Sequence, residues 1–180
     1  MKSTVLAKRY AKALFTVGKE DDAVEQYGRD LTGMAEAFQG VSELADVLVN
    51  PLYPEDVRLK VMEQIGAAMK IAPVMVKFFG LLIRNKRAAI LPDLAESYQM
   101  LVDQDKNLVR GSVLSATELS GGLLDKIKAT LEKITGKQVE LTTRIEPAII
   151  GGMVAKVGDL VLDASLRSQL AGLKESIVNS

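Results

Sequence analysis

Residues 137–146 read KQVELTTRIE, and this run decides the fold class of the chain. Val139, Leu141, Thr143 and Ile145 share one parity, while the residues between them are charged or polar. Successive side chains of a β-strand point to opposite faces of a sheet, so this period of two predicts a half-buried strand. A strand here excludes an all-helical fold and predicts an α+β protein.

The residues around that strand carry further strand signals and two helix signals. Gly158-Asp159 suits the positive φ of a tight hairpin turn, and Gly136 closes a helix that Ser120 caps. We expect strands over 108–115, 137–146, 152–157 and 160–163, and helices over 120–136 and from Asp163 or Ser165 onward, the last with Leu166, Leu170, Leu173 and Ile177 on one face. The order β-α-β-β-β-α indicates a small mixed α/β domain over residues 105–180.

Before residue 105 the apolar period changes to 3.6 residues, which is typical of helices. Six short helices are predicted, beginning near Thr4, Asp22, Glu43, Pro54, Pro73 and Pro92. Proline is well suited to a first helical position, and the tight connections favour antiparallel neighbours. Residues 1–104 are therefore predicted to form a six-helix bundle.

The composition excludes several kinds of functional site. The 180 residues include no His and no Cys, so we expect no metal site of the zinc or iron–sulfur type and no thiolate nucleophile. Residues 1–104 hold 13 basic and 14 acidic side chains and residues 105–180 hold 10 and 9, which predicts no basic stripe for nucleic acid. The longest apolar stretch, Phe78 to Ile83, is far shorter than the ~20 residues of a membrane span. We expect a soluble, cytoplasmic protein without a cofactor.

Catalysis would have to rely on carboxylate, lysine, serine or tyrosine side chains. Asp163 and Ser165, acting with Lys156 or Arg167, are the constellation that could be drawn as a catalytic group. Capping of the last helix explains the first two residues without any chemistry. We therefore expect a non-catalytic protein and keep a small enzyme as an alternative.

The first and fifth predicted helices are more apolar than a single buried stripe requires. Residues 74–83 read VMVKFFGLLI, which is apolar almost all round. The first helix has two apolar sets, one of Leu6, Tyr10, Ala13, Leu14 and Val17 and one of Ala7, Ala11 and Phe15. Either both helices are central in the bundle, or they border a groove that takes an amphipathic helix of another protein.

Residues 7–15, AKRYAKALF, resemble the opening of the delta subunits of F-type ATP synthases, the bacterial and chloroplast homologues of the mitochondrial oligomycin-sensitivity-conferring protein. The most specific similarity is in residues 149–152, IIGG, with Val157-Gly158-Asp159 after it. Further matches are Asn50-Pro51, Asn85, Arg87, Leu91-Pro92, Thr135-Gly136-Lys137, Asp163, Ser165, Arg167 and Leu170. Because these matches span nearly the whole chain in order, it is identified as a member of that family.

The resemblance implies a stator subunit that links the catalytic head to the peripheral stalk and resists rotor torque during proton-driven ATP synthesis. It implies that residues 1–104 hold an N-terminal helix of an alpha subunit between the first and fifth helices, and that residues 105–180 bind the stalk's b subunits. The partner-binding residues it suggests are Tyr10, Ala11, Leu14, Phe15, Met75, Phe79 and Leu82. One copy per complex is expected at the cytoplasmic face of the inner membrane, held there only through the complex and without a nucleic-acid partner.

The alternative within the same class is a generic cytoplasmic adaptor that binds an unrelated amphipathic helix in the same groove. The sequence also leaves open which apolar side chains of the two helices face the groove and which face the bundle core.

Overall fold

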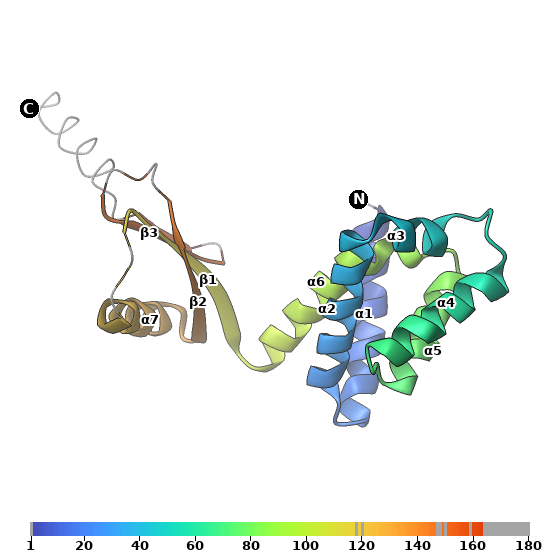
Figure 1. Ribbon diagram of the computed structural model, residues 1–180. Coiled ribbons are helices and arrows are strands. Elements are labelled where there is room, and N and C mark those ends of the chain that lie inside the picture. Colours follow the sequence, from blue (N-terminus) through green and yellow to red (C-terminus); the bar gives the residue numbers. More distant parts are fainter. Residues whose placement is uncertain are drawn as a thin grey trace, which may run out of the picture. The chain divides into compact units, whose positions relative to one another are not determined.

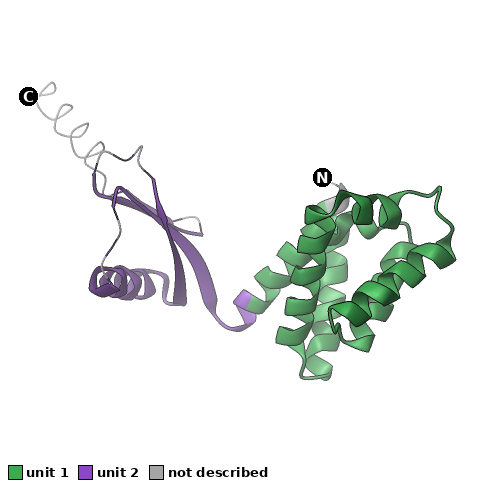
Figure 2. Ribbon diagram, viewed as in Figure 1, with its two compact units in different colours: residues 1–102 green, residues 103–180 purple. Residues whose placement is uncertain are grey.

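The computed structural model describes residues 2–117, 119, 121–146, 149, 151–158 and 160–163. It divides into two compact units, unit 1 over Met1–Val102 and unit 2 over Asp103–Ser180 (Figure 2). The division falls two residues before the change of apolar period at residue 105. Helices and a four-stranded sheet are both present, so the predicted α+β class is confirmed.

Unit 1 is built from helices throughout its described residues (Figure 1). They are α1 (Lys2–Glu20), α2 (Val24–Gly40), α3 (Ser42–Val49), α4 (Glu55–Ala68), α5 (Pro73–Arg84), the 3-10 helix η1 (Ala88–Ile90) and α6 (Leu91–Asp105), whose last turn belongs to unit 2. Pro73 is the first residue of α5, as predicted. Pro54 instead precedes α4 and Pro92 is the second residue of α6, while Thr4 lies inside α1 and caps nothing.

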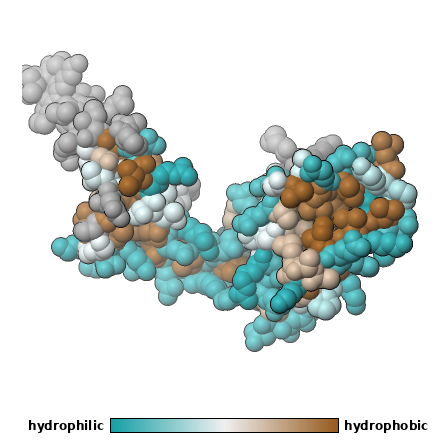
Figure 3. Space-filling view, in the orientation of Figure 1, coloured by the Kyte–Doolittle hydropathy of each residue, from teal (hydrophilic) through white to brown (hydrophobic). Residues whose placement is uncertain are grey.

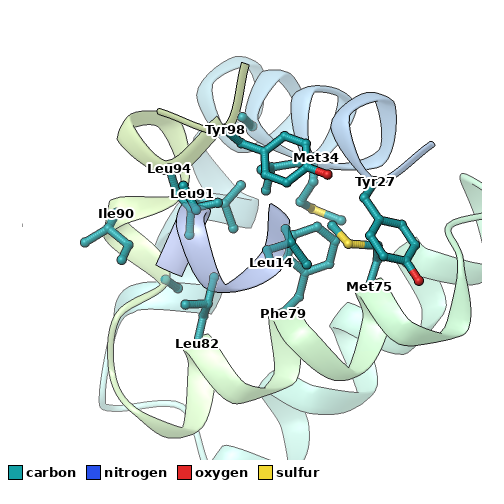
Figure 4. Packing of buried hydrophobic residues seen from close by; sticks show 14 of the residues in the cluster. Leu14, Tyr27, Met34, Met75, Phe79, Leu82, Ile90, Leu91, Leu94 and Tyr98 are labelled. Carbon is teal, nitrogen blue, oxygen red and sulfur yellow. The ribbon is translucent and has the colours of Figure 1, made fainter. Parts of the chain in front are cut away.

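The core of unit 1 draws buried side chains from all six of its described α-helices. Figure 4 shows Met34 of α2, Phe79 of α5 and Leu94 and Tyr98 of α6 in one interior. Gly18 of α1 permits this packing, since an added Cβ would lie 3.0 Å from the Tyr98 hydroxyl and 3.3 Å from Tyr27. The small residues of α1 therefore let it lie close to the two tyrosines.

Two tyrosines tie α1, α2 and α6 together through their hydroxyl groups. Tyr27 Oη donates to Asp21 Oδ2 at 2.6 Å, and Tyr98 Oη donates to the Val24 carbonyl at 3.0 Å. The hydrogen bond to Asp21 raises the pKa of Tyr27 to about 12, with burial adding to it. Burial raises the pKa of Tyr98 to about 12 as well. Both phenols are thus held in their neutral form.

Alkaline pH is expected to destabilise unit 1 through these phenols. A folded-state pKa above the unfolded value of about 10 gives stability that is complete below pH 10 and is lost as pH rises toward 12. Tyr27→Phe should therefore flatten the fall of melting temperature between about pH 9 and about pH 11.5, followed by circular dichroism. Tyr53→Phe, in the exposed α3–α4 connection, is the control. Its melting temperature should fall with pH as steeply as that of wild type. Equal slopes for Tyr27→Phe and wild type would contradict the assignment.

Unit 2 contains the predicted strands and the helix between them. They are β1 (Leu108–Ser115), α7 (Gly121–Thr135), β2 (Gln138–Ile145), β3 (Met153–Val157) and β4 (Leu160–Asp163), and the sheet order is β2-β1-β3-β4. β1 and β2 are parallel, as a helical crossover requires, and the other pairs are antiparallel. Gly158 has φ +58° at the β3–β4 turn, as the hairpin prediction required. The expected last helix lies outside the described residues.

One face of the sheet packs against α7. Val113 of β1, Ala155 of β3 and Ile127 and Leu131 of α7 form the core of unit 2. Of the β2 residues predicted to face the core, Val139 is buried and Leu141 is half-buried. Thr143 and Ile145 are exposed, because the described core reaches only the first half of that strand.

An ion-pair cluster joins the end of α6 to the sheet within unit 2. Arg110 of β1 donates through Nε to Asp103 Oδ2 at 2.8 Å and through Nη2 to Oδ1 of the same carboxylate at 3.3 Å. Its Nη1 lies 3.4 Å from Glu140 Oε2 on β2. The hydrogen bond to Asp103 raises the pKa of Arg110 above its usual value. The guanidinium therefore fixes the turn at Asn107, whose φ is +52°.

Candidate functional site

The α1 and α5 helices carry the residues that the sequence suggested for partner binding, and most of these residues are internal. Ala11, Leu14, Met75, Phe79 and Leu82 are between 0% and 3% exposed, and all belong to the core of unit 1. Figure 4 shows four of them converging on the same interior. These five side chains therefore do not line an open groove. They agree with the alternative expectation that both helices are central in the bundle.

Tyr10 and Phe15, the remaining two suggested residues, are half-buried and face different neighbours. The Phe15 ring meets the Tyr98 ring of α6 edge-on at 5.9 Å, and Lys19 lies 5.1 Å from its centroid. Tyr10 instead meets Phe78 of α5 edge-on at 6.3 Å. The structure therefore brings Tyr10 to α5 and places Phe15 on another side of α1.

Tyr10 connects α1 to the end of α5 and the segment after it. Its hydroxyl accepts a hydrogen bond from Asn85 Nδ2 at 3.5 Å and another from Arg87 Nη1 at 3.4 Å. The Arg87 guanidinium lies 5.7 Å from the centre of the Tyr10 ring, within the range of a cation–π contact. Tyr10, Phe78 and Arg87 thus form one seam between segments about 70 residues apart in sequence.

Each helix presents an outward apolar stripe beside this seam. The spacings of four and three residues keep each stripe on one helix face. Val17, Val74 and Leu81 are 38%, 42% and 48% exposed, while Tyr10 and Phe78 between them are half-buried. We name the combined feature the α1–α5 surface, formed by Leu6, Tyr10, Ala13 and Val17 of α1 and Val74, Phe78 and Leu81 of α5.

The structure decides between the two apolar sets of α1, which the sequence left open. Of the set with Leu6, Tyr10, Ala13, Leu14 and Val17, only Leu14 is fully buried. The inner face is the small-residue set with Ala7 and Ala11, both 0% exposed. Small side chains let a helix approach its neighbours closely, and this favours them over larger ones in a crowded bundle. Val74, Phe78 and Leu81 could have been found from their spacing along α5.

A second apolar area of unit 1 lies over α2, α3 and α4, which face the reader in Figure 3. Exposed apolar side chains of these helices and their ends are Val57 of α4, Val41 before α3 and Met69 after α4. Between α4 and α5 there is also a pocket of about 160 Å³, bordered by Leu59 and Gly80. That volume is below the roughly 300–1,000 Å³ typical of small-molecule sites. The apolar helix faces are therefore the main candidate features of unit 1.

The described residues show little that would support chemistry. Among them no cluster of acidic side chains is arranged to hold a metal ion, and no helix is both long and apolar enough to cross a bilayer. Asp163 pairs in register with Val154 on β3, two residues before the exposed Lys156. Ser165 and Arg167, the other members of the proposed catalytic group, and the stalk candidates Leu166, Leu170, Leu173 and Ile177 lie outside the described residues.

A protein-family model described as ATP synthase delta (OSCP) subunit matches residues 6–177. The chain belongs to the ATP synthase delta (OSCP) family. It is 54% identical over 177 residues to the ATP synthase subunit delta of Desulfotalea psychrophila, with 98% of each chain covered. It is 42% identical to the subunit delta of Desulfosudis oleivorans, covering 98% of this chain and 97% of that one. The resemblance seen in the sequence is thereby confirmed.

A solved structure shows the same fold. The chain aligns to part of the mitochondrial ATP synthase hexamer of Toxoplasma gondii with a TM-score of 0.68 and 24% identity, over 96% of this chain and 97% of that one. A delta (OSCP) chain is a structural, non-catalytic subunit of the ATP synthase and belongs to its peripheral stalk. The prediction of a non-catalytic stator subunit is therefore confirmed, and the alternative of a small enzyme is wrong.

Proposed function

We propose that the α1–α5 surface binds the N-terminal amphipathic helix of an alpha subunit of the catalytic head. The observation that carries this proposal is the pair of outward apolar stripes that meet at the Tyr10–Phe78 ring contact. An amphipathic helix can lay its apolar face along two neighbouring helices when their side chains leave a recessed line between them. Here the exposed Val74 and Leu81 lie beside the half-buried Phe78.

Unit 2 is proposed to hold the end of the stalk's b subunits, so that one chain links head and stalk. The curated relatives match both units, which supports a role for each of them. Two attachments within one assembly make rebinding intramolecular after a local opening, and this raises the effective concentration at each site. We propose one copy per complex, held at the cytoplasmic face of the inner membrane through the complex alone.

Leu81→Glu is expected to weaken binding of a synthetic alpha N-terminal peptide at least about 30-fold, about 2 kcal/mol, because a carboxylate would be buried in the interface. The variant should stay folded, since Leu81 is 48% exposed. Isothermal titration calorimetry with the full chain measures the affinity. Val57→Glu, on α4 and 39% exposed, is the matched control and should bind like wild type. Loss of binding in the control alone would place the binding site on α4 instead.

A further inference from the structure

The two helices of the α1–α5 surface are strongly basic although the whole chain is neutral. From Lys2 to Lys19, α1 contains five cations and no acid, and its one acid is the final residue, Glu20. Residues 73–92, which cover α5 and the segment after it, contain four cations and no acid. The even charge of the two halves therefore hides a local surplus of positive charge on these two helices.

Arg9 and Lys77 place part of that charge at the edges of the apolar stripes. Arg9 directly precedes Tyr10, and Lys77 directly precedes Phe78, so each lies about 100° around its helix from the aromatic ring of the seam. Both side chains are exposed. Within the ranges that the structure describes, neither has a carboxylate partner. These two cations can therefore pair with acids brought by another molecule.

Arg87 adds a third cation beneath the apolar stripes. Its guanidinium is half-buried against the Tyr10 ring and donates to the Tyr10 hydroxyl oxygen. Arg84, by contrast, lies 3.7 Å from Glu55 of α4 and is already paired. Lys77 and Arg84, seven residues apart on α5, both line the pocket between α4 and α5, whereas Arg87 lies against α1.

We infer that the partner helix carries carboxylates along both edges of its apolar face, where Arg9 and Lys77 meet them. This inference rests on the proposed function and specifies the chemistry of the partner. Exposed ion pairs add little to affinity, but complementary charge at the rim of an interface speeds association and fixes orientation. The expected signature is therefore a salt-dependent association rate with a preference for acidic flanks.

An anionic membrane would satisfy the same charges, and it is an outcome of the test. Val17, Val74 and Leu81 are exposed, and the Tyr10–Phe78 pair joins the faces of two helices. A further helix can lay its apolar face along two such helix faces, and the exposed cations beside them complement acidic flanks. The helix is therefore the occupant for which we argue.

The test uses the full chain and two designed peptides of roughly 18 residues, about five turns. Both carry leucine on one face; one has glutamate on both flanks, and its twin has lysine at the same positions. Wild type should bind the glutamate peptide roughly tenfold faster in stopped-flow fluorescence at about 0.05 M salt, and the difference should shrink at about 0.5 M. Arg9→Glu with Lys77→Glu should reverse the preference, and Arg9→Gln with Lys77→Gln should abolish it.

The control is Lys8→Glu with Lys60→Glu, which changes the same net charge at other places. Lys8 lies about 200° around α1 from Tyr10, and Lys60 is exposed on α4. This control should keep the wild-type preference. A wild type that does not distinguish the peptides, a reversal variant that still prefers glutamate, or binding to phosphatidylglycerol vesicles in place of the glutamate peptide would each overturn the inference.

The alpha N-terminal peptide separates this inference from the proposed function. If it binds wild type and Leu81→Glu removes binding while the charge variants change nothing, the inference alone fails. The opposite outcome is that the alpha N-terminal peptide does not bind wild type at all, while the glutamate peptide still binds faster than the lysine peptide. In that case the proposed partner is wrong and the preference for acidic flanks remains.

Discussion

Phe79→Ala is expected to lower the free energy of unfolding of unit 1 by about 3–5 kcal/mol. The Phe79 side chain is 1% exposed and belongs to the core that all six described α-helices of unit 1 share. Removing the ring takes away its burial and leaves a cavity, because the surrounding helices cannot all move inward. Urea unfolding followed by circular dichroism measures the change.

Leu81→Ala is the control for that experiment, since Leu81 lies on the same helix and is 48% exposed. Its cost should stay below about 1 kcal/mol. Equal costs for the two variants would show that Phe79 is not in the core. A glutamate at Phe79 or Leu14 would therefore test folding and not partner binding, although the sequence suggested both as partner-binding residues.

Gly111→Ala is expected to destabilise unit 2 by about 2–3 kcal/mol, because β1 has no room for a methyl group there. An added Cβ would lie 2.5 Å from Val157 Cγ2, 2.9 Å from the Lys156 carbonyl oxygen and 3.0 Å from Leu141 Cδ2. The Lys156 oxygen is backbone, so relief requires β3 to move away from β1. Hydrogen exchange of the full chain should show faster exchange in β1 and β3 and unchanged exchange in α2.

Gly122→Ala gives the matched control for the sheet. Nothing lies within 4 Å of a Cβ added at Gly122 in the first turn of α7. Alanine is a better helix former than glycine, so this variant should be neutral or slightly more stable. Slower folding or loss of protection in Gly122→Ala as well would point to a general effect of glycine replacement and not to the β1–β3 contact.

The elements were predictable where one local rule dominates. The alternation in 138–145 gave a strand, Pro73 marked the start of α5, and Gly136 and Gly158 have the positive φ that their turns require. These features depend on a few neighbouring residues. Local sequence is therefore sufficient to place them to within one or two residues.

The composition of the α1–α5 surface could not be predicted in the same way. A hydrophobicity pattern ranks Leu6 and Val17 above Ala7 and Ala11, yet the alanines are the buried ones. The reason is the close approach of α1 to its neighbours, which is a tertiary property. The contact of Tyr10 with Arg87 likewise joins residues 77 apart, so no local pattern could indicate it.

The Arg110–Asp103 pair has a consequence for how a pull on the sheet spreads along the chain. Tension in β1 would enter the last turn of α6 by two parallel routes, the peptide backbone through Asn107 and the two guanidinium–carboxylate hydrogen bonds. A doubly hydrogen-bonded pair resists bending more than a single contact does, because both bonds must break together. Straightening the turn at Asn107 would therefore break both hydrogen bonds, which adds a contribution of up to about 1 kcal/mol to the stability of this turn.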